Sequence, residues 1–389
     1  MVVVAVAGAS VTGFGRRRDG SGFRDWAGQA FRGALGQATL DPADIDTLIV
    51  ASESDFFTLQ LNPATVLAQD LGLAGAVALR VEGGGASGQL AVHAAAARIM
   101  AGVSRAVAVV GVDAAASTLP GDMVRRLYGR SFDAMTDGPT GVTATQLYAL
   151  SWQCFAAAEG LGADDLAAIT IAHRAQACAN PGAHLPLRHS QAQIDASPMI
   201  AAPYRRLHCS PLSDGAAAVI LTDAALLAAG RAGAARIAGM GAATDRPLGS
   251  RDDPGRFVAK TRAMQAACRM AGVQPRDVDL AEIYDAYAGA ALQGLQALGL
   301  SDRPGRDLAK GRFGRDGALP VNLSGGLLGQ GAAPGATGIA QLAACALMME
   351  GLYHPGAQPG ELPRLALADT HGGVCTTAAV TILRQARAA

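Results

Sequence analysis

Two glycine-rich segments carry residue types that could bind a carbonyl oxygen or a phosphate. Glu82–Gly88 reads Glu-Gly-Gly-Gly-Ala-Ser-Gly between an extended run and a helical run, and Asn322–Gly338 ends in Pro-Gly-Ala-Thr-Gly at the start of another helical run. The first turn of a helix leaves backbone N–H groups without intrahelical partners and carries the positive end of the helix dipole. Both segments are therefore candidate oxyanion or phosphate sites, although a turn made only for tight packing uses the same glycines.

The elements that would position these loops alternate along the chain. Helical patches at Trp26–Leu35 and Ser87–Met100 are each followed by a short β-rich run, at Thr47–Ala51 and Ala106–Val112. This βαβ order predicts an α/β protein with a mostly parallel sheet that helices cover on both faces.

The pattern of the first half recurs in the second half. Three pairs of segments correspond in the same order, as an internal duplication would produce: Asp44–Val50 with Asp277–Ile283, Ala86–Gly102 with Ala336–Gly351, and Ala216–Leu221 with Ala378–Leu383. We expect domains at residues 1–225 and 226–389, with an insertion at about 115–210 in the first. Such a long insertion is usually a lid or a binding domain, and the alternative is a structural cap over the sheet edge.

Composition excludes several classes of protein. Lys plus Arg equals Asp plus Glu at 32 each, so no net charge favours nucleic acid or an anionic membrane as a partner. The six cysteines have no CxxC spacing, which argues against a zinc site or a disulfide framework and favours a reducing cytoplasm. No metal is expected. A transmembrane helix is not expected either, because no run of about 18 uninterrupted apolar residues is present.

Several segments resemble the thiolase superfamily, and together they cover nearly the whole chain. The family's active-site segment runs Gly-His-Pro-x-Gly-Ala-Thr-Gly, and here Gly331 is followed by Ala332 and Ala333 before Pro334. The segments that resemble its sterol-carrier-protein-type branch are Val81–Gly88, His173–Pro181, Ser213–Ala218, Ala281–Tyr287, Asn322–Gly338 and Thr370–Gly373. The resemblance implies a thiolase-like α/β fold, with two duplicated halves stacked as five α-β-α-β-α layers and an inserted loop domain.

The side chains that the family uses for catalysis are replaced. Its nucleophilic cysteine corresponds to Gly85, the histidine of its Glu-x-His-Asp motif to Tyr284, and the histidine of Gly-His-Pro to Ala332. Glycine has no side chain to acylate, so no acyl-enzyme can form at Gly85. Ser87 is expected to cap its helix, and Cys375 is expected to be a buried thiol.

The resemblance also implies which residues remain to form a site. Tyr284 and Asp285 occupy the family's catalytic loop, His371 is the imidazole in the last glycine loop, and the N–H groups of Gly85 and Gly373 would form an oxyanion hole. Alternatively, Asp285 only fixes its loop and His371 is a packed structural histidine. Contacts with coenzyme A are expected at Arg125, Arg126, Ser324 and Gly325, with further positive charge at Arg130, His173, Arg174, Arg205 and Arg206, although solvated surface arginines are an equally good account.

Function follows from this combination as an expectation. We expect an acyl-CoA-binding protein that catalyses non-covalent carbon-carbon bond chemistry, retro-aldol cleavage of a bulky hydroxyacyl-CoA, because thiolase-like aldolases of steroid side-chain degradation also carry tyrosine at the position of Tyr284. Those aldolases tend to carry a second tyrosine where this chain has Ala332. The alternatives are an acyltransferase-type thiolase with a different nucleophile and an inactive acyl-CoA-binding or scaffold subunit. The resemblance further implies a homodimer and a small OB-fold acyl-CoA-associated partner.

Overall fold

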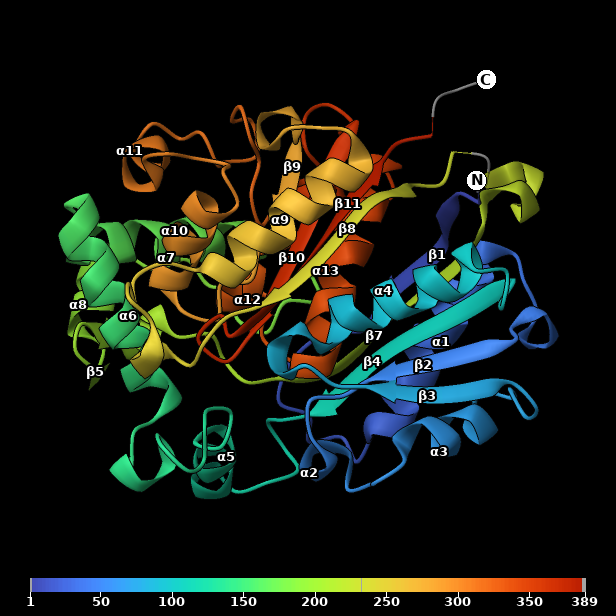
Figure 1. The fold of residues 1–389 in the computed structure, drawn as a ribbon, viewed down its shortest axis with the longest axis horizontal. Helices are drawn as coiled ribbons and strands as arrows, with labels where there is room; N and C mark the ends of the chain where they lie inside the picture. The colour runs from blue at the N-terminus through green and yellow to red at the C-terminus, as the bar shows by residue number, and fades with distance from the viewer. Residues whose placement is uncertain (1, 232, 387–389) are drawn as a thin grey trace.

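The computed structural model describes residues 2–231 and 233–386. Its centre is a nine-stranded sheet in the order β3-β2-β4-β7-β1-β8-β11-β10-β9 (Figure 1). The strands of the first half are β1 (Val4–Val11), β2 (Thr47–Ala51), β3 (Val77–Val81), β4 (Ala106–Ala114) and β7 (Asp214–Asp223). Those of the second half are β8 (Arg236–Thr244), β9 (Leu280–Glu282), β10 (Leu365–Gly372) and β11 (Thr377–Arg384).

The sheet is mixed, so the expectation of a mostly parallel sheet is wrong. β2 pairs in parallel with β3 and β4, and β9 pairs in parallel with β10. The central pairs are antiparallel, from β4 with β7 through to β11 with β10. The βαβ pattern describes only the outer strands, because β10 and β11 are joined by a short turn and such a hairpin is necessarily antiparallel.

Helices and half-sheets form five layers. α1 (Phe23–Ala38) packs on β1 and β7, and α9 (Val258–Ala271) packs on β8 and β11 at the opposite side. α4 (Ser87–Met100) and α13 (Pro334–Met349) fill the middle layer and contact strands of both halves. Their amino-terminal ends touch closely, since a Cβ atom on Gly88 would lie 2.9 Å from the Cα atom of Gly338. The expected five-layer α-β-α-β-α arrangement is thereby confirmed.

The duplication is visible in the topology. β1, β7, β4 and β2 of the first half correspond in order to β8, β11, β10 and β9 of the second. Even β3 has a remnant counterpart, because Val321 forms a single parallel bridge with Ala281 of β9. The expected division between residues 225 and 226 falls in the segment between β7 and β8.

The insertion consists mainly of helices and covers one end of the second half (green in Figure 1). It contains α5 (Gly121–Tyr128), α6 (Ala144–Glu159), α7 (Ala163–Ala177), α8 (Gln191–Ala196) and the short strands β5 (Met199–Ala201) and β6 (Tyr204–Arg205). α6 and α7 pack on α10 (Ala288–Ala297), and α7 packs on α12 (Gly326–Gly329). The remaining helices are α2 (Asp55–Thr58), α3 (Pro63–Asp70) and α11 (Pro304–Ala309).

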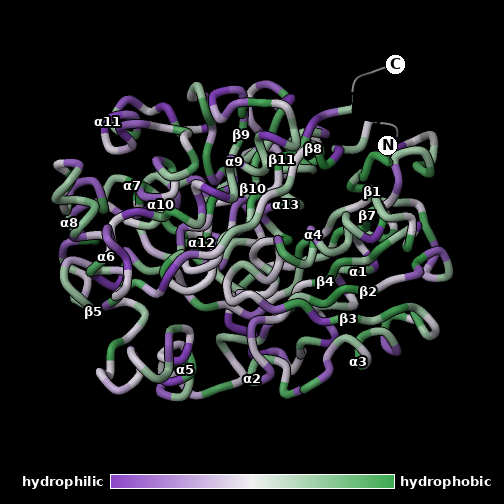
Figure 2. Tube along the Cα trace, viewed as in Figure 1, coloured by the Kyte–Doolittle hydropathy of each residue, from purple (hydrophilic) through white to green (hydrophobic). Residues whose placement is uncertain are grey.

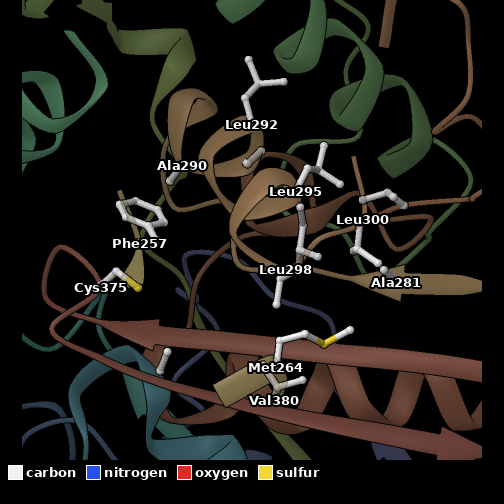
Figure 3. Packing of buried hydrophobic residues seen from close by; sticks show 14 of the residues in the cluster. Phe257, Met264, Ala281, Ala290, Leu292, Leu295, Leu298, Leu300, Cys375 and Val380 are labelled. Carbon is white, nitrogen blue, oxygen red and sulfur yellow. The ribbon is translucent and has the colours of Figure 1, made fainter. Parts of the chain in front are cut away.

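Apolar burial follows the layers. β2 and β4 are buried along their lengths and mostly apolar, with Thr47 and Asp113 as polar exceptions, whereas α11 at the periphery is largely hydrophilic (Figure 2). One apolar cluster joins the insertion to the second half through Phe155, Met264 and Leu295 (Figure 3 shows part of it). Burying such side chains contributes about 1.5–3 kcal/mol each, which fixes the insertion over the end of the sheet. Among the described residues, no helix has the length and apolar character needed to cross a membrane.

Candidate active site

A cavity of about 960 Å³ is lined by residues of both halves and of the insertion. This volume is near the upper end of the range for small-molecule sites, about 300–1,000 Å³. Four of the six tyrosines of the sequence line it. They are Tyr128, Tyr148, Tyr284 and Tyr287. Of the described residues, Glu53 is the one carboxylate in its wall.

Two glycine loops meet at this cavity, one from each half. A Cβ atom on Gly372 would overlap the carbonyl oxygen of Gly83 and lie 3.3 Å from the Cα atom of Gly84. Gly84 and Gly373 have φ values of +60° and +58°, which favour glycine. Among the described residues, no hydrogen-bond partner faces the N–H group of Gly85 or of Gly373. The close approach of the loops therefore leaves two backbone donors free beside the cavity.

The hydroxyl group of Tyr284 occupies the space of the side chain that Gly85 lacks. A Cβ atom built on Gly85 would overlap Tyr284 Oη and would lie 2.8 Å from Tyr284 Cζ and 2.5 Å from the carbonyl oxygen of His371. Real Cβ atoms essentially never approach other atoms so closely. Glycine at position 85 and tyrosine at position 284 are thus sterically matched.

Tyr284 is held in a buried setting that keeps its phenol protonated. Burial raises its pKa well above the ordinary tyrosine value, and the nearby carboxyl group of Glu53 raises it further. Its backbone N–H donates to Asp369 Oδ2 at 3.2 Å, and Asp369 pairs with Lys260 at 2.6 Å, both side chains being fully buried. At neutral pH, Tyr284 can donate a hydrogen bond or a proton but cannot act as a phenolate base.

His371 is a neutral imidazole with a free lone pair. Its Nε2 atom lies 2.8 Å from Tyr148 Oη, and the same hydroxyl donates to the carbonyl oxygen of Gly373. Because Tyr148 has one hydroxyl proton, Nε2 of His371 must carry the proton that joins the pair. Nδ1 is then an acceptor that is buried and has no partner in the described part of the chain. Burial lowers the pKa of His371 well below its ordinary value, so the imidazole stays neutral.

Asp285 is fully engaged in holding its loop. It accepts hydrogen bonds from the Leu327 N–H at 2.6 Å and from His173 Nδ1 at 2.7 Å. The side chains of Asp285 and His173 are both buried. It does not line the cavity, unlike its neighbours Tyr284 and Ala286. Its position fits the loop-fixing alternative, because the carboxylate is fully buried, each of its oxygens accepts a hydrogen bond from the protein, and it does not reach the cavity.

Comparison with known proteins identifies the family. Residues 2–175 match the family described as "Thiolase, N-terminal domain", and residues 241–385 match "Thiolase C-terminal domain-like". The chain belongs to the thiolase superfamily. Part of the chain is also similar to bovine sterol carrier protein 2, with 32% identity over 35% of this chain and 26% of that protein.

Relatives of this thiolase-superfamily chain have different named activities. It is 32% identical to an acetyl-CoA acetyltransferase of Methanothermobacter thermautotrophicus, over 97% of this chain and 98% of the relative. It is 28% identical to the 17-hydroxy-3-oxo-4-pregnene-20-carboxyl-CoA lyase of Mycobacterium tuberculosis, over 87% of this chain and 89% of the relative. The solved structure "Ltp2-ChsH2(DUF35) aldolase" superposes with a TM-score of 0.82 at 22% identity, over 100% of this chain and 99% of that one, which shows a shared fold.

Three of the four residues expected to contact coenzyme A, Arg126, Ser324 and Gly325, do not line the cavity. Ser324 is buried and donates to Glu282 Oε2 at 2.5 Å, and a Cβ atom on Gly325 would lie 2.7 Å from the Cα atom of Ala177. Both residues are therefore part of the packed support behind the site. Arg126 is exposed on α5 and does not line the cavity. Arg125 lies in α5, but its side chain is outside the described part of the structure.

Positive charge does reach the cavity through other arginines. Arg174 of α7 is almost completely buried, and its Nη2 atom donates to the carbonyl oxygen of Leu207 at 3.1 Å. Burial lowers its pKa to about 10, which still leaves it charged at neutral pH. Arg16 and Arg206 also line the cavity. The sequence reasoning included Arg174 and Arg206 among its basic residues but missed Arg16.

Tyr148, His184 and Glu53 are among the other cavity residues that the sequence analysis missed. Tyr148 comes from α6 of the insertion, and nothing in its local sequence marks it. His184 also lines the cavity. Its backbone N–H donates to the Gln330 carbonyl oxygen at 2.9 Å, and its imidazole Nδ1 atom lies 2.8 Å from Ser213 Oγ, near the segment that has Ala332 in place of the family's histidine. Glu53 lies two residues after the end of β2, and the carboxyl end of a parallel strand is a common place for functional side chains, a signal that could have found it.

Cysteine chemistry is not supported at the cavity. Cys375 lies in the same apolar cluster as Phe257 and Met264 (Figure 3), and burial raises its pKa to about 12. Cys209 does line the cavity, but burial raises its pKa to about 12 as well. Thiols, not thiolates, are therefore present at neutral pH, and a thiol is a poor nucleophile. Across the described residues, no group of three or more His, Cys, Asp or Glu side chains could hold a metal ion.

Proposed function

We propose that this protein binds an acyl-CoA and cleaves a carbon-carbon bond without a covalent intermediate. The reaction is the retro-aldol cleavage of a bulky β-hydroxyacyl-CoA of the steroid side-chain type. The observation that carries the proposal is the steric match between Gly85 and Tyr284: a protonated phenol fills the place of a thiol, directly beside two free backbone donors.

The chemistry divides among three groups. We assign the base role to His371, which lines the cavity: its buried Nδ1 atom must become accessible by a shift of the imidazole or its cover when substrate binds, and it then accepts the proton of the β-hydroxyl group as the Cα–Cβ bond breaks and the β-carbon becomes a carbonyl. The electron pair of that bond moves into the thioester, whose oxygen becomes an enolate oxygen. The N–H groups of Gly85 and Gly373 stabilise that oxygen, as preorganised donors do in water-excluded sites, where one donor contributes about 3–4 kcal/mol. The Tyr284 hydroxyl donates a further hydrogen bond to the reacting oxygens.

The cavity suits a CoA thioester with a large acyl group. Its volume of about 960 Å³ and its apolar and phenolic walls fit a bulky hydrocarbon skeleton. Arg16, Arg174 and Arg206 supply positive charge for the phosphate groups of coenzyme A. The named substrate of the Mycobacterium tuberculosis lyase, a hydroxylated pregnene carboxyl-CoA, has this combination of features and is the first compound to assay.

An acyltransferase with a different nucleophile is the second candidate. Cys209 is the residue to consider, because it is the cysteine that lines the cavity among the described residues. Its raised pKa argues against it. Incubation with an acyl-CoA donor followed by intact-mass measurement separates the two candidates: retro-aldol chemistry leaves the protein mass unchanged, and a covalent acyl adduct that Cys209→Ser abolishes would establish the acyltransferase.

Assembly with other chains belongs to the same proposal. β3 forms a free edge of the sheet, with Val77 43% and Leu79 38% exposed, and a second copy could pair there to form a homodimer. The aldolase of similar fold is named together with ChsH2(DUF35), and we infer a small OB-fold acyl-CoA-associated partner for this chain as well. An inactive scaffold subunit remains the third candidate, because the thiolase side chains are replaced at Gly85, Tyr284 and Ala332.

A turnover assay tests the proposal. The purified chain, alone and with the partner, is incubated with the hydroxylated pregnene carboxyl-CoA, and the release of a ketone and a shortened acyl-CoA is followed by mass spectrometry. Tyr284→Phe removes only the hydroxyl and should lower kcat about 100-fold, the lower end of the effect of a general acid. Absence of cleavage by the unmodified chain under all these conditions would favour the scaffold.

A further inference from the structure

Glu53 stands at the junction of the cavity and the first glycine loop. Its Oε2 atom accepts a hydrogen bond from the Tyr128 hydroxyl at 2.9 Å, and its backbone N–H donates to Asp113 Oδ2 at 3.0 Å. Its Oε1 atom lies 3.7 Å from the position that a Cβ atom on Gly84 would take. Among the described residues, nothing forms a hydrogen bond with Oε1. One oxygen of the carboxyl group is thus anchored, and the other is free beside the proposed oxyanion hole.

The surroundings of Glu53 favour a carboxyl group that holds its proton. Asp113 and Glu82 are its acidic neighbours, burial raises the pKa of Asp113 itself to about 7, and Tyr128 and Tyr284 are uncharged at neutral pH. Arg80 places positive charge near Asp113, but it pairs with Asp55, and Arg130 is exposed at the wall of a smaller cavity. Burial, followed by the charge of Asp113, raises the pKa of Glu53 to about 8.

A second cavity gives this carboxyl group its own contact with solvent. Glu53 and Tyr128 line both the main cavity and a smaller one of about 360 Å³. The two residues therefore form part of the partition between the cavities. A proton can return to Glu53 through the smaller cavity while an acyl group fills the larger one.

We propose that Glu53 is the catalytic acid that protonates the α-carbon of the enolate, and that Tyr128 is the positioning residue that aims it. This inference rests on the proposed function and names the proton carrier that the retro-aldol reaction needs after bond cleavage. Among the described residues, the geometry leaves one acidic side chain in the cavity wall, with its free oxygen next to the loop that would hold the enolate oxygen.

The proton balance is complete. The Oε1–H bond breaks, its proton bonds to the α-carbon through the electron pair of the enolate C=C bond, and the thioester C=O bond reforms. Glu53 is left as a carboxylate, and His371 holds the proton taken earlier from the β-hydroxyl group. Transfer of one proton from His371 to solvent and of one from solvent to Glu53 restores the resting state.

The reverse of this step can be measured without any aldol substrate. Propionyl-CoA incubated with the enzyme in D₂O should exchange its α-protons, because carboxylate Glu53 removes a proton and the oxyanion hole stabilises the enolate. Glu53→Gln should slow this exchange about 100-fold or more and slow retro-aldol turnover by a similar factor. Glu53→Asp should restore part of both rates, and Glu361→Gln, at an exposed carboxylate away from the cavity, should change neither.

The rates of retro-aldol turnover and of α-proton exchange must depend on pH in opposite ways. Retro-aldol turnover needs protonated Glu53, so its rate should fall as the pH rises through about 8, the pKa of Glu53. Exchange needs the carboxylate, so its rate should rise through the same pH. The hydrogen bond from Tyr128 lowers the pKa of Glu53. Tyr128→Phe should therefore shift the fall in turnover and the rise in exchange to higher pH.

Each outcome is decisive for one of the two proposals. If the unmodified chain cleaves the hydroxyacyl-CoA and Glu53→Gln cleaves it equally fast with the same pH profile, the role of Glu53 is refuted while the retro-aldol function stands. If the unmodified chain exchanges α-protons through Glu53 but cleaves no hydroxyacyl-CoA, the acid is established and the retro-aldol function fails. Circular dichroism and thermal melting of Glu53→Gln and Glu53→Asp separate loss of catalysis from loss of folding.

Discussion

Restoring the family's cysteine at Gly85 should not restore thiolase activity. The Cβ atom introduced by Gly85→Cys would overlap Tyr284 Oη and lie 2.5 Å from the carbonyl oxygen of His371. The Tyr284 side chain can move, but the carbonyl belongs to β10 and cannot move without disturbing the sheet. Overpacking of this kind costs about 1–3 kcal/mol. At about 2.1 cal/mol/K per residue, unfolding a chain of this length has an entropy of about 0.8 kcal/mol/K, so Tm should fall by about 1–4 °C.

Thermal melting and intact-mass measurement test this reasoning together. Gly85→Cys combined with Tyr284→Ala removes one of the two steric conflicts, so we expect Tm to recover only in part. Neither variant should accumulate an acyl adduct from acetyl-CoA, because Ala332 leaves no imidazole in the family's place to activate a thiol. An unchanged Tm for Gly85→Cys, or an acyl adduct on the introduced thiol, would show that position 85 is open and that our account of the site is wrong.

Two further substitutions probe the groups behind the site. Lys260→Met leaves Asp369 buried without its partner, which should cost about 3–5 kcal/mol, or about 4–6 °C in Tm. The pKa of Asp369 is already raised by burial, and without Lys260 it rises further, so the deficit should shrink when the pH falls and Asp369 binds a proton; an equal deficit at pH 5 and pH 8 would contradict this. Asp285→Asn should lower Tm because the hydrogen bonds from Leu327 and His173 are weakened, with a loss of about 1–3 kcal/mol in the free energy of unfolding. The pH–rate profile should keep both of its limbs. Loss of one limb at unchanged Tm would instead make Asp285 a catalytic residue.

Much of the fold could be predicted from the sequence because its signals are local. The runs at Thr47–Ala51 and Ala106–Val112 became β2 and β4, since continuous apolar stretches of β-branched residues are typical of buried strands. The three corresponding segment pairs became matching elements because a duplicated half repeats its own local pattern. Parallel or antiparallel pairing is different: it depends on which strands meet, and the pattern of β10 and β11 alone did not reveal the hairpin.

The site was predicted less completely because its members come from distant segments. Gly85, Tyr284 and His371 were found through short motifs, and the structure brings all three to one cavity. Tyr148 and His184 belong to the insertion, where no repeated pattern indicates which side chains point inward. Ser324 was misplaced for a related reason: a motif residue can support the site from behind, and only the burial of its hydroxyl against Glu282 distinguishes support from contact.

The replacement at position 85 and the tyrosine at position 284 are best understood as one change in chemistry. A thiolate and a buried phenol cannot share one volume, and the structure gives that volume to the phenol. A thiolate supplies an electron pair to a thioester carbon, whereas a phenol whose pKa is raised by burial supplies only a proton. The backbone donors at Gly85 and Gly373 do not depend on either side chain, because the contact between the two glycine loops positions them. A scaffold that loses its nucleophile in this way keeps the ability to stabilise an enolate, and that ability is what bond cleavage without a covalent intermediate requires.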